Sequence, residues 1–216
     1  MKKLIRSKNR RLSQFLYAFS LVFLGLGLFS LGWTVWPVPT DAVEINIPAG
    51  LLPGAPADEQ FDSLSAYALE ISWPAWVRKG ERGVLSLSLT DLDPLPAGLA
   101  DESQVVLVEP ALYPLRVDPP GGVQANLGDD QALELTWTVS GETAGDYAGK
   151  LYVSFGFFDD AEGVLDIVPV AVVDLQVRVV ELWGLASGLV IWLGFVSLAI
   201  WGALFVLGRV VGGGSG

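Results

Sequence analysis

Two long runs of apolar residues dominate the hydropathy pattern of the chain. Residues 15–36 include no charged side chain over 22 positions, and residues 182–208 include none over 27. A helix that crosses the hydrocarbon core of a bilayer needs about 20 residues. The pattern therefore predicts two transmembrane helices, which we place at residues 13–36 and 182–208.

The first run follows six basic residues, as the apolar core of a signal peptide does. That core is usually only about 7–15 residues long and ends at small residues suited to cleavage. Here the run is longer, and Trp33, Trp36, Pro37 and Pro39 stand at its end. We therefore expect an uncleaved anchor, with a cleaved signal peptide as the alternative.

Between these runs, apolar and polar residues alternate over several stretches. Leu85, Leu87 and Leu89 alternate with polar residues, and the same period recurs at residues 133–139 and 151–157. A period of two is typical of strands with one buried and one solvated face, as in antiparallel sheets. Further strands are expected at residues 43–47, 69–73, 104–108 and 165–178. Seven to nine short strands without a long amphipathic helix indicate an antiparallel β-sandwich. The predicted fold class is mainly β plus two transmembrane α-helices.

Residues 144–153, AGDYAGKLYV, resemble the turn into strand F of immunoglobulin-like domains. In that family a tyrosine at this corner bonds to the backbone a few residues upstream. The resemblance implies this role for Tyr147. Antibody domains have a cysteine two residues later, where this chain has Gly149. The resemblance thus implies an immunoglobulin-like sandwich over residues 37–181, outside the antibody subgroup, and implies no activity.

Basic residues orient the predicted helices. Six lie in residues 1–12, and Arg209 opens the glycine-rich segment 209–216, whereas Arg178 alone lies close to the other side. Basic residues near the ends of membrane helices tend to stay in the cytoplasm. We therefore expect a multi-pass protein of the cell membrane with both termini cytoplasmic and residues 37–181 extracytoplasmic.

All 24 acidic residues lie between the two helices, together with six basic residues, which leaves this segment a net charge of −18. Such a charge repels nucleic acid and anionic headgroups, so we expect no nucleic-acid partner. Acidic clusters at residues 91–93, 129–130 and 159–162 offer oxygen ligands of the kind that calcium prefers. None has the spacing of an EF-hand loop, and acidic turn residues are the simpler interpretation. Calcium binding stays an alternative.

The chain has no cysteine and no histidine, so the usual ligands of zinc, haem and iron–sulfur clusters are missing. Without them an enzyme would need a carboxylate pair, a Ser-Lys dyad or a tyrosine base. The only lysines between the helices, Lys79 and Lys150, lie in turn-like segments. We expect no catalytic residue, no cofactor, no metal site and no enzymatic activity.

Small residues recur at helical spacing in both apolar runs. Ala18, Gly25 and Gly32 are seven residues apart, and Gly184 and Gly188 form a small-xxx-small pair. Small side chains let membrane helices approach closely. We expect these five residues to pack helices together; the alternative is that glycine and alanine are simply common in membrane helices.

Aromatic residues mark the predicted membrane boundaries. Trp33, Trp36 and Trp183 fall at the outer boundary and Tyr17 falls near the inner one. This distribution is typical of the aromatic belts of membrane proteins.

These features favour an accessory or structural subunit of a larger membrane complex, with the acidic sandwich on the outer side. The expected partners are other membrane subunits and the lipid bilayer. Two alternatives are a tethered extracellular binding or adhesion module and a homo-oligomeric two-helix channel. Pores usually show charged or polar rings, and in the second helix only Ser187 and Ser197 are polar.

Overall fold

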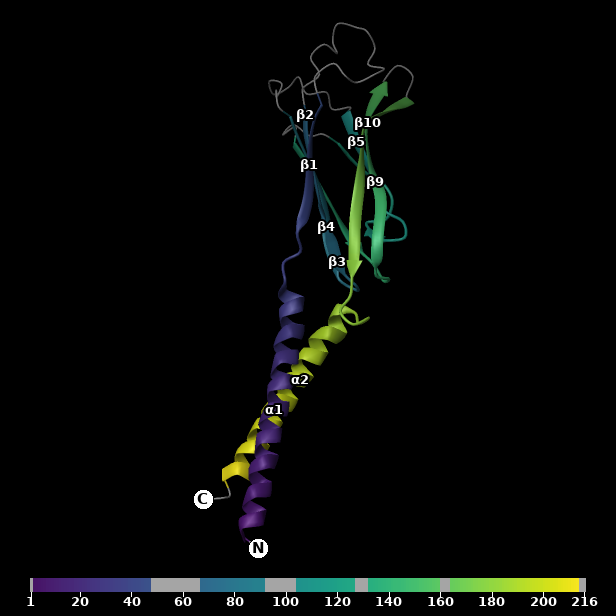
Figure 1. The fold of residues 1–216 in the computed structure, drawn as a ribbon. Helices are drawn as coiled ribbons and strands as arrows, with labels where there is room; N and C mark the ends of the chain where they lie inside the picture. Colours follow the sequence, from purple (N-terminus) through teal and green to yellow (C-terminus); the bar gives the residue numbers. More distant parts are fainter. Residues whose placement is uncertain (1, 48–66, 92–103, 127–131, 160–163, 214–216) are drawn as a thin grey trace. The chain divides into compact units, whose positions relative to one another are not determined.

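The structure, a computed structural model, describes residues 2–47, 67–91, 104–126, 132–159 and 164–213. The chain divides into two compact units. One unit, residues 38–180, is the β domain, and the other, residues 1–37 with 181–216, is the helix pair. The protein is mostly β, with two long apolar helices near its termini (Figure 1).

The strands of the β domain form two sheets of five strands each within the described residues. The first sheet has the order β1 (Thr40–Ile47), β2 (Tyr67–Pro74), β4 (Arg82–Asp91), β8 (Ala132–Ser140), β6 (Arg116–Asp118). The second has the order β3 (Trp76–Arg78), β10 (Val164–Val180), β9 (Gly145–Asp159), β5 (Gln104–Ala111), β7 (Val123–Asn126). All neighbours are antiparallel except β3 and β10, which are parallel.

The expectation of an antiparallel sandwich of seven to nine short strands is therefore corrected in part. The described residues contain ten strands, and β3 pairs with β10 in parallel. The long strand expected at residues 165–178 is β10, with 17 residues, and β9 is also long, with 15. The register of β10 shifts between Pro169 and Ala171, where the proline interrupts the regular pairing.

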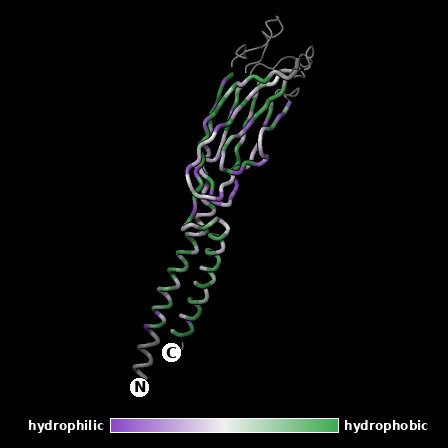
Figure 2. Tube along the Cα trace, turned by 90° about the vertical axis from the view of Figure 1, so that its right-hand side faces the viewer, coloured by the Kyte–Doolittle hydropathy of each residue, from purple (hydrophilic) through white to green (hydrophobic). Residues whose placement is uncertain are grey.

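The two sheets share one hydrophobic core. Trp137 from β8 and Phe155 from β9 are each 1% exposed, so these two positions of the alternating stretches at residues 133–139 and 151–157 face inward, as a period of two predicts. Leu85, Leu87 and Leu89 of β4 are also fully buried. In Figure 2 hydrophilic and hydrophobic residues alternate along the strands, which is why each sheet has one face that can be buried in the core. The helix pair, in contrast, is hydrophobic over long stretches.

Gly149 of β9 lies beside Ala111 and Leu112, where the chain leaves β5 for the first sheet. A Cβ atom at Gly149 would lie 2.4 Å from the carbonyl oxygen of Ala111 and 2.9 Å from the Cα of Leu112. Only glycine leaves room for backbone at this distance. The position that holds cysteine in antibody domains therefore has no space for any side chain here.

The chain enters and leaves the β domain at one end, which we call the junction end. The N–H of Ala75 donates to the carbonyl of Pro39 (2.9 Å), and the carbonyl of Ala75 accepts from the N–H of Arg178 (3.0 Å). The N–H of Lys79 donates to the carbonyl of Val180 (2.8 Å). Both connecting segments are thus hydrogen-bonded to the same stretch of chain.

The helix pair consists of α1 (Lys2–Val35) and α2 (Ser187–Gly213), which pack antiparallel. Their apolar parts, Arg11–Val35 and Ser187–Gly212, are long and apolar enough to cross a membrane. The predicted start of the second helix at residue 182 is wrong. Trp183 (φ 55°) and Gly184 (φ 75°) are in the left-handed region, which a right-handed helix excludes, and they form a turn between Leu182 and Leu185.

Candidate functional site

Glycines and serines form the contact between the two helices, which we call the seam. A Cβ atom at Gly27 would lie 3.1 Å from the carbonyl oxygen of Gly194, and one at Gly194 would lie 3.4 Å from the carbonyl oxygen of Gly27. The two backbones therefore approach as closely as small-residue packing allows. The seam consists of buried small residues from both helices: Ser13, Ser20, Gly27 and Ser30 of α1, and Ser187, Gly194, Ser197 and Gly208 of α2.

The hydroxyl groups of α1 bond mainly to their own helix. Ser20 Oγ donates to the carbonyl of Tyr17 and Thr34 Oγ to the carbonyl of Leu31, both at 2.8 Å. Ser30 Oγ is buried and has no hydrogen-bond partner among the described residues. Burial in the seam removes these polar groups from the apolar outer face of the pair, which suits a lipid environment.

The predicted packing residues of the first helix lie on the opposite face of α1. Ala18, Gly25 and Gly32, which we call the outer stripe, are exposed. A Cβ atom at Gly25 or Gly32 would meet nothing within 4 Å. Gly25 precedes Gly27 by two residues, and two residues correspond to a rotation of about 200° around the helix axis. The two glycines therefore lie on nearly opposite faces of α1. The outer stripe therefore takes no part in the contact between α1 and α2.

The predicted pair in the second helix does not form a helical face. Gly188 is exposed in the first turn of α2 with open space around it, but Gly184 lies in the turn before the helix. The sequence did carry a signal for the real seam. Ser13, Ser20, Gly27 and Thr34 repeat every seven residues, parallel to the outer stripe.

Of the predicted boundary aromatics, Trp33, Trp36 and Trp183 lie next to the ends of the helices that face the β domain in the chain, whereas Tyr17 lies six residues inside the apolar segment Arg11–Val35. Tyr17 packs edge-on against Phe205, with ring centroids 5.7 Å apart. Trp183, although outside α2, contacts Phe29 with centroids 5.8 Å apart. Trp33 is half-buried and Trp36 is exposed. Their position at membrane interfaces stays a prediction.

Tyr147 in β9 forms the corner bond that the resemblance implied. Its hydroxyl donates to the carbonyl oxygen of Thr143, four residues upstream, at 2.8 Å. The ring is half-buried beside the core, so the bond ties the loop before β9 to the second sheet.

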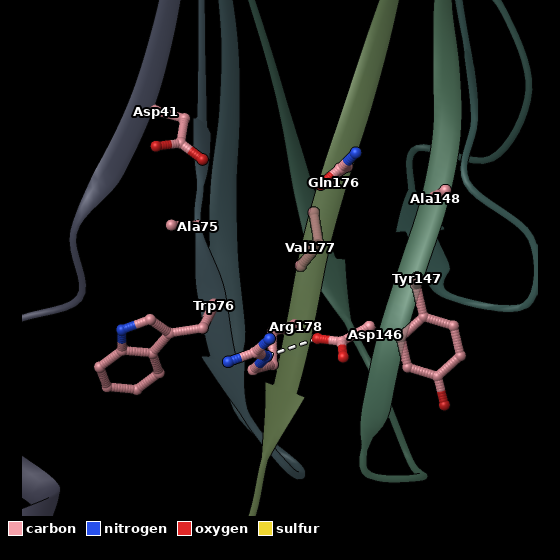
Figure 3. A pocket seen from close by; sticks show the side chains of 9 residues that line it. All are labelled: Asp41, Ala75, Trp76, Asp146, Tyr147, Ala148, Gln176, Val177 and Arg178. Atoms are coloured by element: carbon pink, nitrogen blue, oxygen red, sulfur yellow. Dashed lines mark hydrogen bonds and ion pairs between the residues drawn. The ribbon is translucent and has the colours of Figure 1, made fainter.

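A shallow groove with a volume of about 590 Å³ lies beside this corner (Figure 3). Its wall combines β1, β3, β9 and β10 at the junction end. The lining residues are Asp41, Ala75, Trp76, Asp146, Tyr147, Ala148, Gln176, Val177 and Arg178. The parallel pairing of β3 with β10 sets Trp76 in register with Arg178, so an indole and a guanidinium stand next to each other in the groove.

Charge in the groove is largely compensated. Arg178 Nε donates to Asp146 Oδ1, and this hydrogen bond, with the attraction of the carboxylate, raises the pKa of Arg178 above its ordinary value. Asp41 and Gln176 are exposed and add an acid and an amide. The guanidinium carbon of Arg78 lies 5.0 Å from the centre of the Trp76 ring, so one face of the indole already contacts a cation. The groove combines this ring with polar groups, a combination that suits binding of a polar ligand.

The described residues contain no group of three acidic side chains able to hold a metal ion. Most of the acidic clusters considered for calcium, including Asp93, Asp129, Asp130, Asp160 and Glu162, lie outside the described residues. Calcium binding and the absence of enzymatic activity stay predictions.

No protein family and no curated protein sequence matches this chain. Several solved structures are similar over about half of it. The CARDB domain of the PF1109 protein from Pyrococcus furiosus, in complex with di-metal ions, is 17% identical over 52% of this chain and 90% of that domain, with a TM-score of 0.33. A PapD-like domain of human CEP192 is 13% identical over 50% of this chain and 82% of that one, also with a TM-score of 0.33. WR4, a C. elegans MSP family member, is 10% identical over 51% of this chain and 97% of that one, with a TM-score of 0.29. Similarity at this level assigns neither a family nor a ligand.

Proposed function

We propose that this protein is a non-enzymatic two-pass protein of the cell membrane that acts as an accessory or structural subunit of a larger membrane complex. Its β domain, of immunoglobulin-like type, stands on the extracytoplasmic side. Two apolar helices of sufficient length and the junction of both with one end of the β domain support this topology.

One observation carries the subunit role: α1 has small residues on two opposite faces. The seam face contacts α2, whereas the outer stripe of Ala18, Gly25 and Gly32 is exposed. A helix that meets only lipid on its outer face has no need of a repeated small residue there, because larger apolar side chains cover the backbone equally well. A stripe with open space above it suits close approach by a helix of another subunit.

The location of the serines disfavours the channel. The buried hydroxyls of α2, those of Ser187 and Ser197, lie in the seam and not on an outer face. A pore between protomers would need polar groups on an outward face of the helices.

The test is co-purification of the tagged full-length chain from its native membrane. In the variant Gly25→Leu/Gly32→Leu the outer stripe is filled while the seam is untouched. The variant should insert and fold normally but fail to co-purify with the partner. Gly188→Leu/Gly202→Leu is the matched control, since these α2 glycines also have open space around them, and it should behave as wild type. Partner recovery at wild-type yield from the first variant would refute docking through the outer stripe.

The orientation is tested separately. A reporter inserted between Gly121 and Gly122, in a turn of the β domain, should be external, and one fused after Arg209 should be cytoplasmic. If the turn becomes accessible to protease only after the membrane is disrupted, the proposed orientation is wrong.

The groove supports a second candidate, a tethered binding module that uses Trp76 and Arg178 for recognition. Such a module would be indifferent to leucines in the outer stripe and would lose its ligand in Trp76→Ala. Capture of a soluble or surface ligand by wild type and by the stripe variant, but not by Trp76→Ala, would favour this function over the subunit.

A further inference from the structure

Arg82 and Arg116 differ from the other basic residues of the β domain in their side-chain interactions. Three of the six are in ion pairs: Arg78 with Glu81 (3.0 Å), Lys150 with Asp174 (3.5 Å) and Arg178 with Asp146. Lys79 also has an interaction partner. The remaining two, Arg82 and Arg116, are exposed, and neither side chain has an ion pair or hydrogen bond within the described part of the chain.

The sheet register brings these two arginines together. Arg82 at the start of β4 and Arg116 at the start of β6 both pair with Ser140 at the end of β8, one from each side. Val139 of β8 is fully buried, so its neighbour Ser140 points to the outer face of the first sheet, and residues paired directly with Ser140 point the same way. Adjacent strands are about 4.8 Å apart, so the two Cα atoms are separated by about 10 Å with the serine between them.

From the sequence, a local basic site was unexpected in a segment with a net charge of −18. On this face Asp118 lies two residues along β6, Glu142 follows Ser140 by two, and Glu81, which precedes Arg82, is paired with Arg78. Two guanidinium groups can converge over the serine hydroxyl and supply several donors to one phosphate group, whose oxygens they match in geometry.

The location of this cluster indicates the source of the phosphate. The N–H of Gly80 donates to the carbonyl of Gly141 (3.2 Å), next to Ser140, and the N–H of Lys79 donates to the carbonyl of Val180. The cluster therefore belongs to the junction end, from which four residues lead back to α1 and six lead on to α2. If the helices span the membrane, the headgroup layer is the phosphate-rich surface nearest to this end.

We propose that Arg82, Ser140 and Arg116 form a binding site for the phosphate group of an anionic phospholipid in the outer leaflet. The site rests on the proposed membrane topology. It would hold the junction end of an otherwise acidic domain against the headgroups.

The experiment measures phosphatidylglycerol bound to the full-length chain in maltoside micelles, by native mass spectrometry. In Arg82→Gln/Arg116→Gln the affinity should fall by about thirtyfold, since each arginine near a lipid surface contributes about fivefold. The control Lys150→Glu makes the same change in net charge on the second sheet, away from the groove, and should retain wild-type binding. The thermal midpoint of all three proteins should agree.

Equal binding by wild type and Arg82→Gln/Arg116→Gln would overturn the site, and so would an equal loss in the control, which would reduce the effect to net charge. Glycerol phosphate is the soluble competitor. Its failure to displace the lipid supports a headgroup site, whereas full displacement at millimolar concentration would overturn the lipid assignment in favour of a free phosphate ester. Release of the wild-type chain from membranes by alkaline carbonate would refute the topology itself, independently of the arginine variants.

Discussion

The substitution Gly149→Ala tests the close passage of the chain between the two sheets. The added methyl group would lie 2.4 Å from the carbonyl oxygen of Ala111, 2.7 Å from Leu112 Cδ2 and 2.9 Å from Leu112 Cα. Ordinary contacts of this kind need at least about 3.4 Å, so the backbone at Ala111 and Leu112 must move by about 1 Å. A side chain can rotate away from such a clash, but these backbone atoms cannot.

Overpacking of a well-packed interior costs about 1–3 kcal/mol, and a clash with backbone belongs in the upper part of that range. Replacing glycine with alanine in a strand otherwise gains about 0.5–1 kcal/mol. The free energy of unfolding of the β domain should therefore fall by about 2 kcal/mol, which for a domain of this size lowers the midpoint by about 4–8 °C.

The assay is thermal unfolding of the full-length chain in detergent micelles, followed by near-ultraviolet circular dichroism, which reports the packing of Trp137 and Trp73. Gly122→Ala is the control, because its added Cβ would meet nothing closer than 3.6 Å. The control should unfold within about 1–2 °C of wild type. A midpoint for Gly149→Ala equal to that of the control would refute the close passage of Ala111 and Leu112 beside β9.

Two further substitutions test the core and the corner by the same assay. Trp137→Ala should lower the free energy of unfolding by about 3–5 kcal/mol because the side chain is 1% exposed, and a loss below about 1 kcal/mol would contradict its burial between the sheets. Tyr147→Phe removes only the hydroxyl that bonds to Thr143 and should cost about 1 kcal/mol or less. Tyr152→Phe is its control, because Tyr152 is 41% exposed and its hydroxyl has no hydrogen bond within the described residues. Equal stability of the two variants would show that the corner bond contributes nothing.

The sequence predicts the regularly alternating strands well and the short ones poorly. Six to eight residues of strict alternation identify β4 and β8, since each inward position must be apolar. The three residues of β3 are too few to show a period, and their parallel pairing with β10 depends on the chain changing sheets after Pro74. The groove was missed for the same reason, because Trp76 and Arg178 are brought together only by that pairing.

The helix pair shows a different limit. Two small-residue repeats run along α1, one through Gly25 and one through Gly27, and both have the spacing that close packing requires. Spacing alone does not say which repeat faces the second helix, because this depends on where α2 packs. The serines were the better guide, since a hydroxyl is more costly than glycine on a lipid-facing surface.

The hydrogen bonds of the junction end bear on the choice between a subunit and a tethered module. Ala75 binds the segment that leads in from α1 through its N–H and the last part of β10 through its carbonyl. The two connections cannot separate without breaking these bonds, so the spacing of the chain at the point where both helices attach is fixed by the β domain itself. A module that only needs a tether gains nothing from this constraint, and a single flexible segment would serve it. A subunit whose two helices both contact a partner benefits directly, because the two points at which the chain enters and leaves the β domain then keep a fixed separation. The bonds around Ala75 therefore support the same function as the outer stripe, from a part of the molecule that does not depend on it.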